Sequence, residues 1–429
     1  MILSTDDNPQ FSHGEEFQMF SSFPKLEKKV WSWCAYDVGN SAFATTIMAA
    51  IYPVYFREVA SQGLASNIST AYWAYTASAA LFLSAFSSPL LGALADIQGS
   101  KKRMLAIFTG IGVLSTGCMA FIGPGDWLFA LFLMAGGTIG FTISIIFYDA
   151  LLPSLVPPER IDRVSAQGYA FGYLGGGVLL AINFLFIALL PGTMGARLSF
   201  FSVAIWWGGF TLPVLYNVAE PPVDGERIDT NTALRGGARR LQNTFREIRS
   251  YRNLFLFLVA FWFYNDGIGT IIRMATIYGS QLGISMNHLV GALLLTQFVG
   301  IPFSLAFGTL ASRIGSKKTI LIGLYFYLCL IVAAVFISKP WHFWALAFSV
   351  GMVQGGTQAI SRSFFASMIP AGRTAEFFGF YDISSKFSGI LGPAIFGFVT
   401  QVTGSSPLAI LILSYTFILG IVILRKVQG

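Results

Sequence analysis

The sequence has few charged residues for its length. Asp, Glu, Lys and Arg together make up 11% of the 429 residues, whereas 55% are hydrophobic. A soluble chain of this composition would expose large apolar patches to water. We therefore exclude a soluble protein and expect the lipid bilayer as the main partner.

Histidine and cysteine are also scarce. None of the three histidines, His13, His288 and His342, stands in an H-E-x-x-H pattern, so hydrolytic metal chemistry has almost no ligands. The three cysteines lie inside apolar runs, where thiols behave as small hydrophobic groups. We expect no enzyme activity, no cofactor, no metal and no disulfide framework.

Glycine is abundant, with a cluster at Gly172, Gly175, Gly176 and Gly177. A phosphate-binding loop is excluded there, because no strand precedes the cluster and no Lys-Ser or Lys-Thr pair follows it. These glycines are expected to allow close packing against the other half of the chain.

Twelve apolar runs predict twelve membrane helices, each long enough to cross a hydrocarbon core of about 30 Å. They are expected near 31–55, 71–95, 104–122, 127–148, 164–190, 198–216, 253–278, 287–311, 319–337, 341–360, 377–402 and 407–424. The predicted domains are a disordered cytoplasmic tail (1–24), an N-terminal six-helix bundle (25–216), a cytoplasmic linker (217–251) and a C-terminal six-helix bundle (252–429). The basic linker either lies on the membrane surface, attracted by anionic lipid, or is a solvated connector.

The net charge of +7 would suggest nucleic acid as a partner in a soluble chain. Here Lys and Arg lie between the apolar runs, so we expect no nucleic acid. With both termini in the cytoplasm, most basic residues face that side. The opposite face holds Arg57, Arg197 and Lys339, and Arg273 is a further candidate for that face. The positive-inside rule favours this topology.

The stretch GALADIQGSKKR at 92–103 recurs as GTLASRIGSKK at 308–318. The residues in register are Gly92 with Gly308, Gly99 with Gly315, Ser100 with Ser316, Lys101 with Lys317, and Lys102 with Lys318. Each copy follows a long apolar run and leads directly into another. The chain is therefore two related halves, each with a tight basic turn between two membrane helices.

The pattern G-x-x-x-D-x-x-G-x-K-K resembles the loop between helices 2 and 3 of the major facilitator superfamily. WCAYDVGNSAFATTIMAAIYPVYF at 33–56 and GGTQAISRSFFASMIPAGRTAEFFGFYDISSKFSGILGP at 355–393 resemble the branch of autophagy-associated vacuolar effluxers and their bacterial relatives. The resemblance implies an all-α fold of two pseudo-symmetric six-helix bundles that rock around a midplane site. It also implies export of small solutes, with neutral amino acids as the best guess and proton coupling.

The two turns are expected to act in gating. Asp96 is expected to contact the positive end of helix 11 and to hold the cytoplasmic side shut. Ser312 stands at the matching position of the second turn, so the two contacts should differ in strength. The other predicted gating residues of the turns are Gly92, Gly99, Lys101, Lys102, Arg103, Gly308 and Gly315.

Charged side chains at membrane depth are costly and usually mark a pathway or a partner. The resemblance places helices 1, 4, 7 and 10 around the central cavity, so Asp37 is expected at or just below the solute pathway; alternatively, it pairs with a neighbouring helix and only fixes packing. Asp266 on helix 7 is either a proton carrier or neutralised by Arg273, which could also be an extracellular gate.

Two further charge pairs are predicted. Asp382 and Lys386 stand four residues apart on helix 11, which allows a self-contained pair or a switch in which Lys386 moves to Asp37 or another carboxylate. Aligning PSLVPPER with ASMIPAGR puts Asp149 opposite Arg362 at the ends of helices 4 and 10. Opposite charges there predict a cytoplasmic latch.

Neutral polar side chains complete the candidate site. They are Asn40, Ser41, Asn265, Gln354, Thr357 and Gln358. Such groups could bind a zwitterionic or polar solute, or they could bond neighbouring helices. The sequence thus predicts a monomeric secondary transporter, most consistent with a bacterial plasma membrane because the loops are short. The alternatives are an exporter of another metabolite or drug-like solute, and a non-transporting sensor or scaffold on the same fold.

Overall fold

The structure, a computed structural model, describes residues 27–220, 243, 251–281, 284, 286–337, 339–388, 391–403 and 406–428. The predicted tail (1–24) lies outside the described residues, as does most of the predicted linker. The domain boundaries therefore stay predictions.

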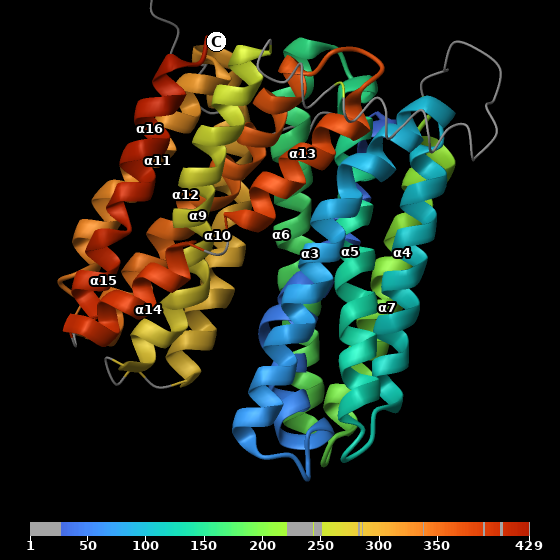
Figure 1. Cartoon of the computed structure of the whole chain (residues 1–429), viewed down its shortest axis with the longest axis vertical. Coiled ribbons are helices and arrows are strands. Elements are labelled where there is room, and N and C mark those ends of the chain that lie inside the picture. Colours follow the sequence, from blue (N-terminus) through green and yellow to red (C-terminus); the bar gives the residue numbers. More distant parts are fainter. Residues whose placement is uncertain are drawn as a thin grey trace, which may run out of the picture.

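The first half is a series of helices joined by short turns (Figure 1). Its first span is broken into α1 (Lys28–Ala42), a π-helical segment (Phe43–Ala50), α2 (Tyr52–Tyr55) and a second π-helical segment (Phe56–Ala60). The elements that follow are α3 (Ser66–Gln98), α4 (Lys101–Cys118), the 3-10 turn Met119–Phe121, α5 (Trp127–Leu155), the 3-10 turn Pro158–Arg160, α6 (Ile161–Leu189) and α7 (Met194–Asn217).

The second half repeats this arrangement. Its helices are α9 (Arg252–Gln281), α10 (Met286–Ile314), α11 (Ser316–Ala334), α12 (Pro340–Met368), α13 (Thr374–Phe387), α14 (Leu391–Thr403), α15 (Ser406–Ile412) and α16 (Ser414–Lys426). The eleventh span consists of α13 and α14, and the twelfth of α15 and α16.

Nine helical stretches of the described residues are long and apolar enough to cross a membrane. The other three spans are the broken first span, α12 and the divided eleventh span. The first and eleventh spans are not selected because they are divided into short helical pieces, and α12 is not selected because polar residues such as Gln354 and Gln358 lower its mean hydropathy. With them the described part of the chain has twelve spans, all helical, as the sequence predicted.

Both repeated turns lie at one end of the molecule, which we call the basic end. Gly99 ends α3 with φ of 59°, and Gly315 precedes α11 with φ of 92°, a region that side chains other than glycine rarely adopt. The C-terminus lies at the same end (Figure 1), where Lys317 Nζ donates to the carbonyl of Arg425 at 3.0 Å.

The two halves contact each other mainly through α3 with α13 and α6 with α10. In Figure 1 their ribbons lie closest toward the basic end. There a Cβ at Gly379 would come within 2.6 Å of the backbone of Pro89, and one at Gly308 within 2.6 Å of the Ala166 side chain. Glycine therefore permits the close approach between the halves.

The glycine cluster of α6 packs differently from the prediction. A Cβ at Gly175 would contact Val38, and one at Gly172 or Gly176 would contact Ser41, so these glycines face α1 of their own half. Only Gly177 of the cluster lies against the other half, beside Gln297. The expectation was wrong for three of the four glycines, because a helix in a bundle has neighbours on both sides.

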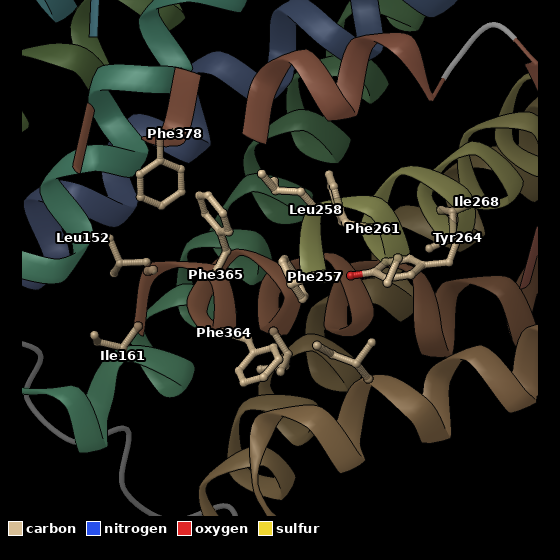
Figure 2. Packing of buried hydrophobic residues seen from close by; sticks show 14 of the residues in the cluster. Leu152, Ile161, Phe257, Leu258, Phe261, Tyr264, Ile268, Phe364, Phe365 and Phe378 are labelled. Carbon is tan, nitrogen blue, oxygen red and sulfur yellow. The ribbon is translucent and has the colours of Figure 1, made fainter. Parts of the chain in front are cut away.

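An aromatic core lies between α9, α12 and α13 (Figure 2). Phe261 stacks on Tyr381 with ring centroids 4.2 Å apart, and Phe365 stacks on Tyr381 at 4.9 Å. Leu152 and Ile161 of the first half belong to the same cluster. This core therefore continues across the contact between the halves, next to the site described below.

Candidate functional site

Arg362 of α12 is the centre of a buried charge cluster between the halves. Its side chain is 5% exposed, and its Nη1 donates to Asp149 Oδ1 of α5 at 3.0 Å. The same Nη1 lies 3.6 Å from Asp37 Oδ2 of α1. One guanidinium of the second half is therefore shared by two carboxylates of the first.

The remaining guanidinium donors of Arg362 are bound by α6. Nε donates to the Ser165 hydroxyl and Nη2 to the Ser165 carbonyl, both at 2.9 Å. The Ser165 hydroxyl in turn donates to the carbonyl of Ala359 at 2.7 Å. A Cβ at Gly168 would stand 2.6 Å from Asp37 Oδ2, so this glycine lets α6 approach the charges.

Aromatic rings enclose the guanidinium. Its Cζ lies 4.9 Å from the Trp33 ring centroid, 4.6 Å from that of Tyr169 and 5.7 Å from that of Tyr148. Trp33 stacks on Tyr148 at 4.4 Å and donates from Nε1 to its carbonyl at 3.0 Å. The Tyr148 hydroxyl donates to Asp37 Oδ2 at 2.7 Å. Cation–π contacts and hydrogen bonds thus hold all the charges in place.

We call Asp37, Tyr148, Asp149 and Arg362 the arginine cluster. The alignment of the halves predicted that Asp149 faces Arg362, and the structure places these side chains in contact. Asp37 was considered separately as a pathway residue, yet it lies in the same cluster. The gating and coupling roles of these residues stay predictions.

The other predicted charge pair lies within α13. Lys386 Nζ is 3.4 Å from Asp382 Oδ1, and Asp382 Oδ2 accepts from the Ser88 hydroxyl of α3 at 3.1 Å. In this structure Lys386 pairs with Asp382, while Asp37 is paired with Arg362. The pair nevertheless joins the halves, because Ser88 belongs to the first half.

The polar residues of α9 meet the break between α13 and α14. Asn265 Nδ2 donates to the Ser388 hydroxyl at 2.7 Å, and Asp266 Oδ1 accepts from the backbone N–H of Gly392 at 3.0 Å. Asp266 therefore lies at the positive end of α14, where a carboxylate is favourable. The side chain of Arg273 lies outside the described residues.

Asp96 of α3 contacts the start of α13. Its carboxylate accepts from the backbone N–H of Ala375 at 3.2 Å and of Glu376 at 2.9 Å, and it lies 3.0 Å from Lys101 Nζ. A Cβ at Gly92 would overlap the carbonyl of Ala375. We call this contact the first lock; its geometry is the one expected for a carboxylate at a helix N-terminus.

Other residues of the first turn form the start of α4, where their backbone N–H groups bind Glu220. The backbone N–H of Lys101 donates to Glu220 Oε1, and that of Lys102 donates to Glu220 Oε2 at 3.4 Å. Arg103 is exposed. Glu220 thus fastens the segment after α7 to this turn, a role the sequence did not reveal.

The neutral polar residues are distributed along the helices. Asn40 is buried in α1, Ser41 lies against α6, and Gln358 is half-buried in α12. The Gln354 side chain lies near the Tyr173 hydroxyl of α6. Tyr173 reaches across between Gly300 and Gly355 of the other half, and no charge or motif marks it in the sequence.

Comparison with solved structures shows the fold. The chain is similar to the proton:xylose symporter XylE bound to 6-bromo-6-deoxy-D-glucose, with a TM-score of 0.74, 12% identity, and coverage of 93% of this chain and 95% of that one. It is also similar to the human organic anion transporter MFSD10, with a TM-score of 0.73, 14% identity, and coverage of 94% and 100%. These likenesses define the major facilitator fold.

Comparison of sequences shows the family. The family described as "Vacuole effluxer Atg22 like" matches residues 25–428. The MFS-type transporter YxiO of Bacillus subtilis is 40% identical over 423 residues, which cover 95% of this chain and 96% of that protein. Autophagy-related protein 22-1 of Penicillium rubens is 25% identical, with 81% and 75% covered. The chain belongs to the Atg22-like branch of the major facilitator superfamily and is a membrane transporter.

Proposed function

We propose that this transporter exports neutral amino acids by alternating access and couples export to protons. The basic end is then the cytoplasmic end, with both termini on that side, because Lys and Arg concentrate there. The plasma membrane of a bacterium is the proposed location, supported by a bacterial relative of nearly equal length.

The observation that carries proton coupling is the sharing of Arg362 by Asp37 and Asp149. Two ionised carboxylates around one guanidinium leave one excess negative charge in a buried site, and a buried charge without a partner is costly. A bound proton removes that charge. When the halves separate at the basic end, Arg362 must leave both carboxylates, and the proton affinity of Asp37 and Asp149 then increases.

The cluster also supports alternating access. Asp37 and Asp149 belong to the first half and Arg362 to the second, so the basic end cannot open without breaking their contacts. The Asp382 contact with Ser88 and the first lock cross the same boundary. The described conformation is therefore closed at the basic end, and transport requires release of these contacts.

The family supports export, and polar groups in the second half support an amino-acid cargo. The matching family is described as an effluxer family. Asp382, Lys386 and Asn265 supply a carboxylate, an ammonium group and an amide in the second half. A zwitterion presents complementary charges to such groups without adding net charge to the membrane interior.

The test is flux of a labelled mixture of neutral amino acids in proteoliposomes, with and without an imposed pH gradient. We expect gradient-driven accumulation that Asp37→Asn abolishes while the protein stays folded. Asp126→Asn is the matched control, because Asp126 lies at the opposite end and accepts from the N–H of Gly123 in its own turn. Normal gradient-driven flux in Asp37→Asn would remove Asp37 from the coupling mechanism.

Flux that is the same with and without the pH gradient would refute proton coupling but not the proposed export of amino acids. Absence of amino-acid flux from a folded preparation would refute the cargo. The same liposomes would then be tested with other small metabolites, and failure of all of them would favour the sensor or scaffold.

A further inference from the structure

The two basic turns contact the opposite half in different ways. In the first lock the carboxylate belongs to the turn side, where Asp96 accepts from the backbone of Ala375 and Glu376. The second turn carries Ser312 at the position of Asp96, and its hydroxyl accepts from Arg163 Nε at 3.3 Å. The second turn thus has no acidic residue of its own between Gly308 and Lys318.

A carboxylate is nevertheless present, on the other partner of this contact. The register that pairs Asp149 with Arg362 also pairs Asp162, in the first turn of α6, with Ala375 in the first turn of α13. Asp162 therefore stands where the first lock offers only a backbone N–H. In the second contact the acidic residue therefore belongs to the helix, α6, and not to the basic turn.

Asp162 binds two elements of the second half at once. Its Oδ2 accepts from the Ser316 hydroxyl at the start of α11 at 2.7 Å, and its Oδ1 accepts from the Ser363 hydroxyl of α12. Ser363 directly follows Arg362. A close approach of Gly308 to the backbone of Asp162 and Arg163 brings the second turn to this point.

We propose that Asp162 is the carboxylate of a second, reversed lock and a positioning residue for Arg362. It ties the second turn and α12 to the first half, and through Ser363 it holds Arg362 in the register in which its guanidinium meets Asp149. Hydrogen bonds to an ionised acceptor are stronger than those between neutral groups, so two hydroxyls suffice for this contact.

Asp162 has a different set of surroundings from Asp96. The first lock pairs its carboxylate with Lys101 and a helix N-terminus, whereas Asp162 is bound by the hydroxyls of Ser316 and Ser363 and has Arg163 beside it in sequence. Two serines carry no charge signal, which explains why the sequence pattern did not indicate this lock.

The experiment measures the distance between the halves directly. Spin labels are attached at Arg103→Cys and Lys318→Cys, two exposed positions at the basic end, one in each half. The three native cysteines are first replaced by alanine. Double electron–electron resonance then gives the proportions of molecules closed and open at this end, with no substrate required.

We expect Asp162→Ala to raise the ratio of open to closed molecules about tenfold or more, since it removes two charge-assisted hydrogen bonds. Asp162→Glu should restore part of the closed population. The double variant Ser316→Ala/Ser363→Ala should open the basic end to a similar extent, and adding Asp162→Ala to it should change little. Asp126→Ala is the carboxylate control and should leave the distances unchanged.

An unchanged distance distribution in both Asp162→Ala and the serine double variant would overturn the proposal. If Asp162→Ala does not fold, the serine double variant decides alone, because it removes the donors and keeps the carboxylate. The inference concerns the lock and not the cargo, so these distances can support it even if amino-acid flux is absent.

Discussion

Replacing Arg362 by alanine should open the basic end more than replacing Asp149. Arg362→Ala leaves Asp37 and Asp149 buried without their cation, and loss of one partner of a buried pair costs about 3–5 kcal/mol. Asp149→Ala leaves Arg362 with Asp37, whose Oδ2 is already 3.6 Å away. Its cost should therefore be smaller, about 1–3 kcal/mol.

The double variant separates these effects. Once Arg362 is absent, removing Asp149 also removes an orphaned carboxylate, so the two costs should not add. We expect a coupling free energy of about 2 kcal/mol, which corresponds to a factor of about 30 in the ratio of open to closed molecules. The spin labels at positions 103 and 318 measure this ratio for the parent, both single variants and the double variant.

A coupling below about 0.5 kcal/mol would refute the reasoning, because sites that do not interact are additive within that limit. Asp126→Ala combined with Arg362→Ala provides the control cycle, since Asp126 lies in a turn at the opposite end and should show no coupling. Opening in both single variants without coupling would mean that Asp149 and Arg362 act through separate contacts.

Three further predictions follow from single contacts. Gly92→Ala should shift the spin-label distances toward the open state, because a Cβ there overlaps the carbonyl of Ala375, whereas Gly110→Ala on the neighbouring α4 has open space and should change nothing. Asp266→Ala should lower the melting temperature through a loss of about 1 kcal/mol of helix capping, while Asp266→Asn keeps an oxygen for the Gly392 N–H and should lose less. Burial raises the pKa of Glu220 above its ordinary value. The native state therefore disfavours the ionised form of Glu220. The melting temperature of the parent relative to Glu220→Gln should fall as pH rises through that pKa. A difference in melting temperature that does not vary with pH would contradict the raised pKa of Glu220.

The fold could be predicted because its signals are local. The repeated turns at Gly92 and Gly308 each lie between apolar runs, and the register of the halves also brought Asp149 opposite Arg362. The breaks inside the first and eleventh spans were not predicted, since their sequences continue as apolar runs.

The site was only partly predictable, because its partners come from distant helices. The sequence paired Asp149 with Arg362 and treated Asp37 separately, but nothing in the sequence says that one guanidinium serves both carboxylates. Ser165 and Asp162 escaped notice for a related reason. Their contacts depend on how closely α6 approaches α12, and that distance is set by packing across the two halves.

The two pieces of the eleventh span are attached to different parts of the protein. α13 is attached to the first half by Asp96 and Ser88, whereas α14 is attached to α9 by the contact between Gly392 and Asp266. An unbroken helix would transmit every displacement of one end to the other as a rigid rod. Because α13 ends at Phe387 and α14 begins at Leu391, the two helices are not one rigid rod. A movement of α13 with the basic end therefore does not have to displace α14 from α9.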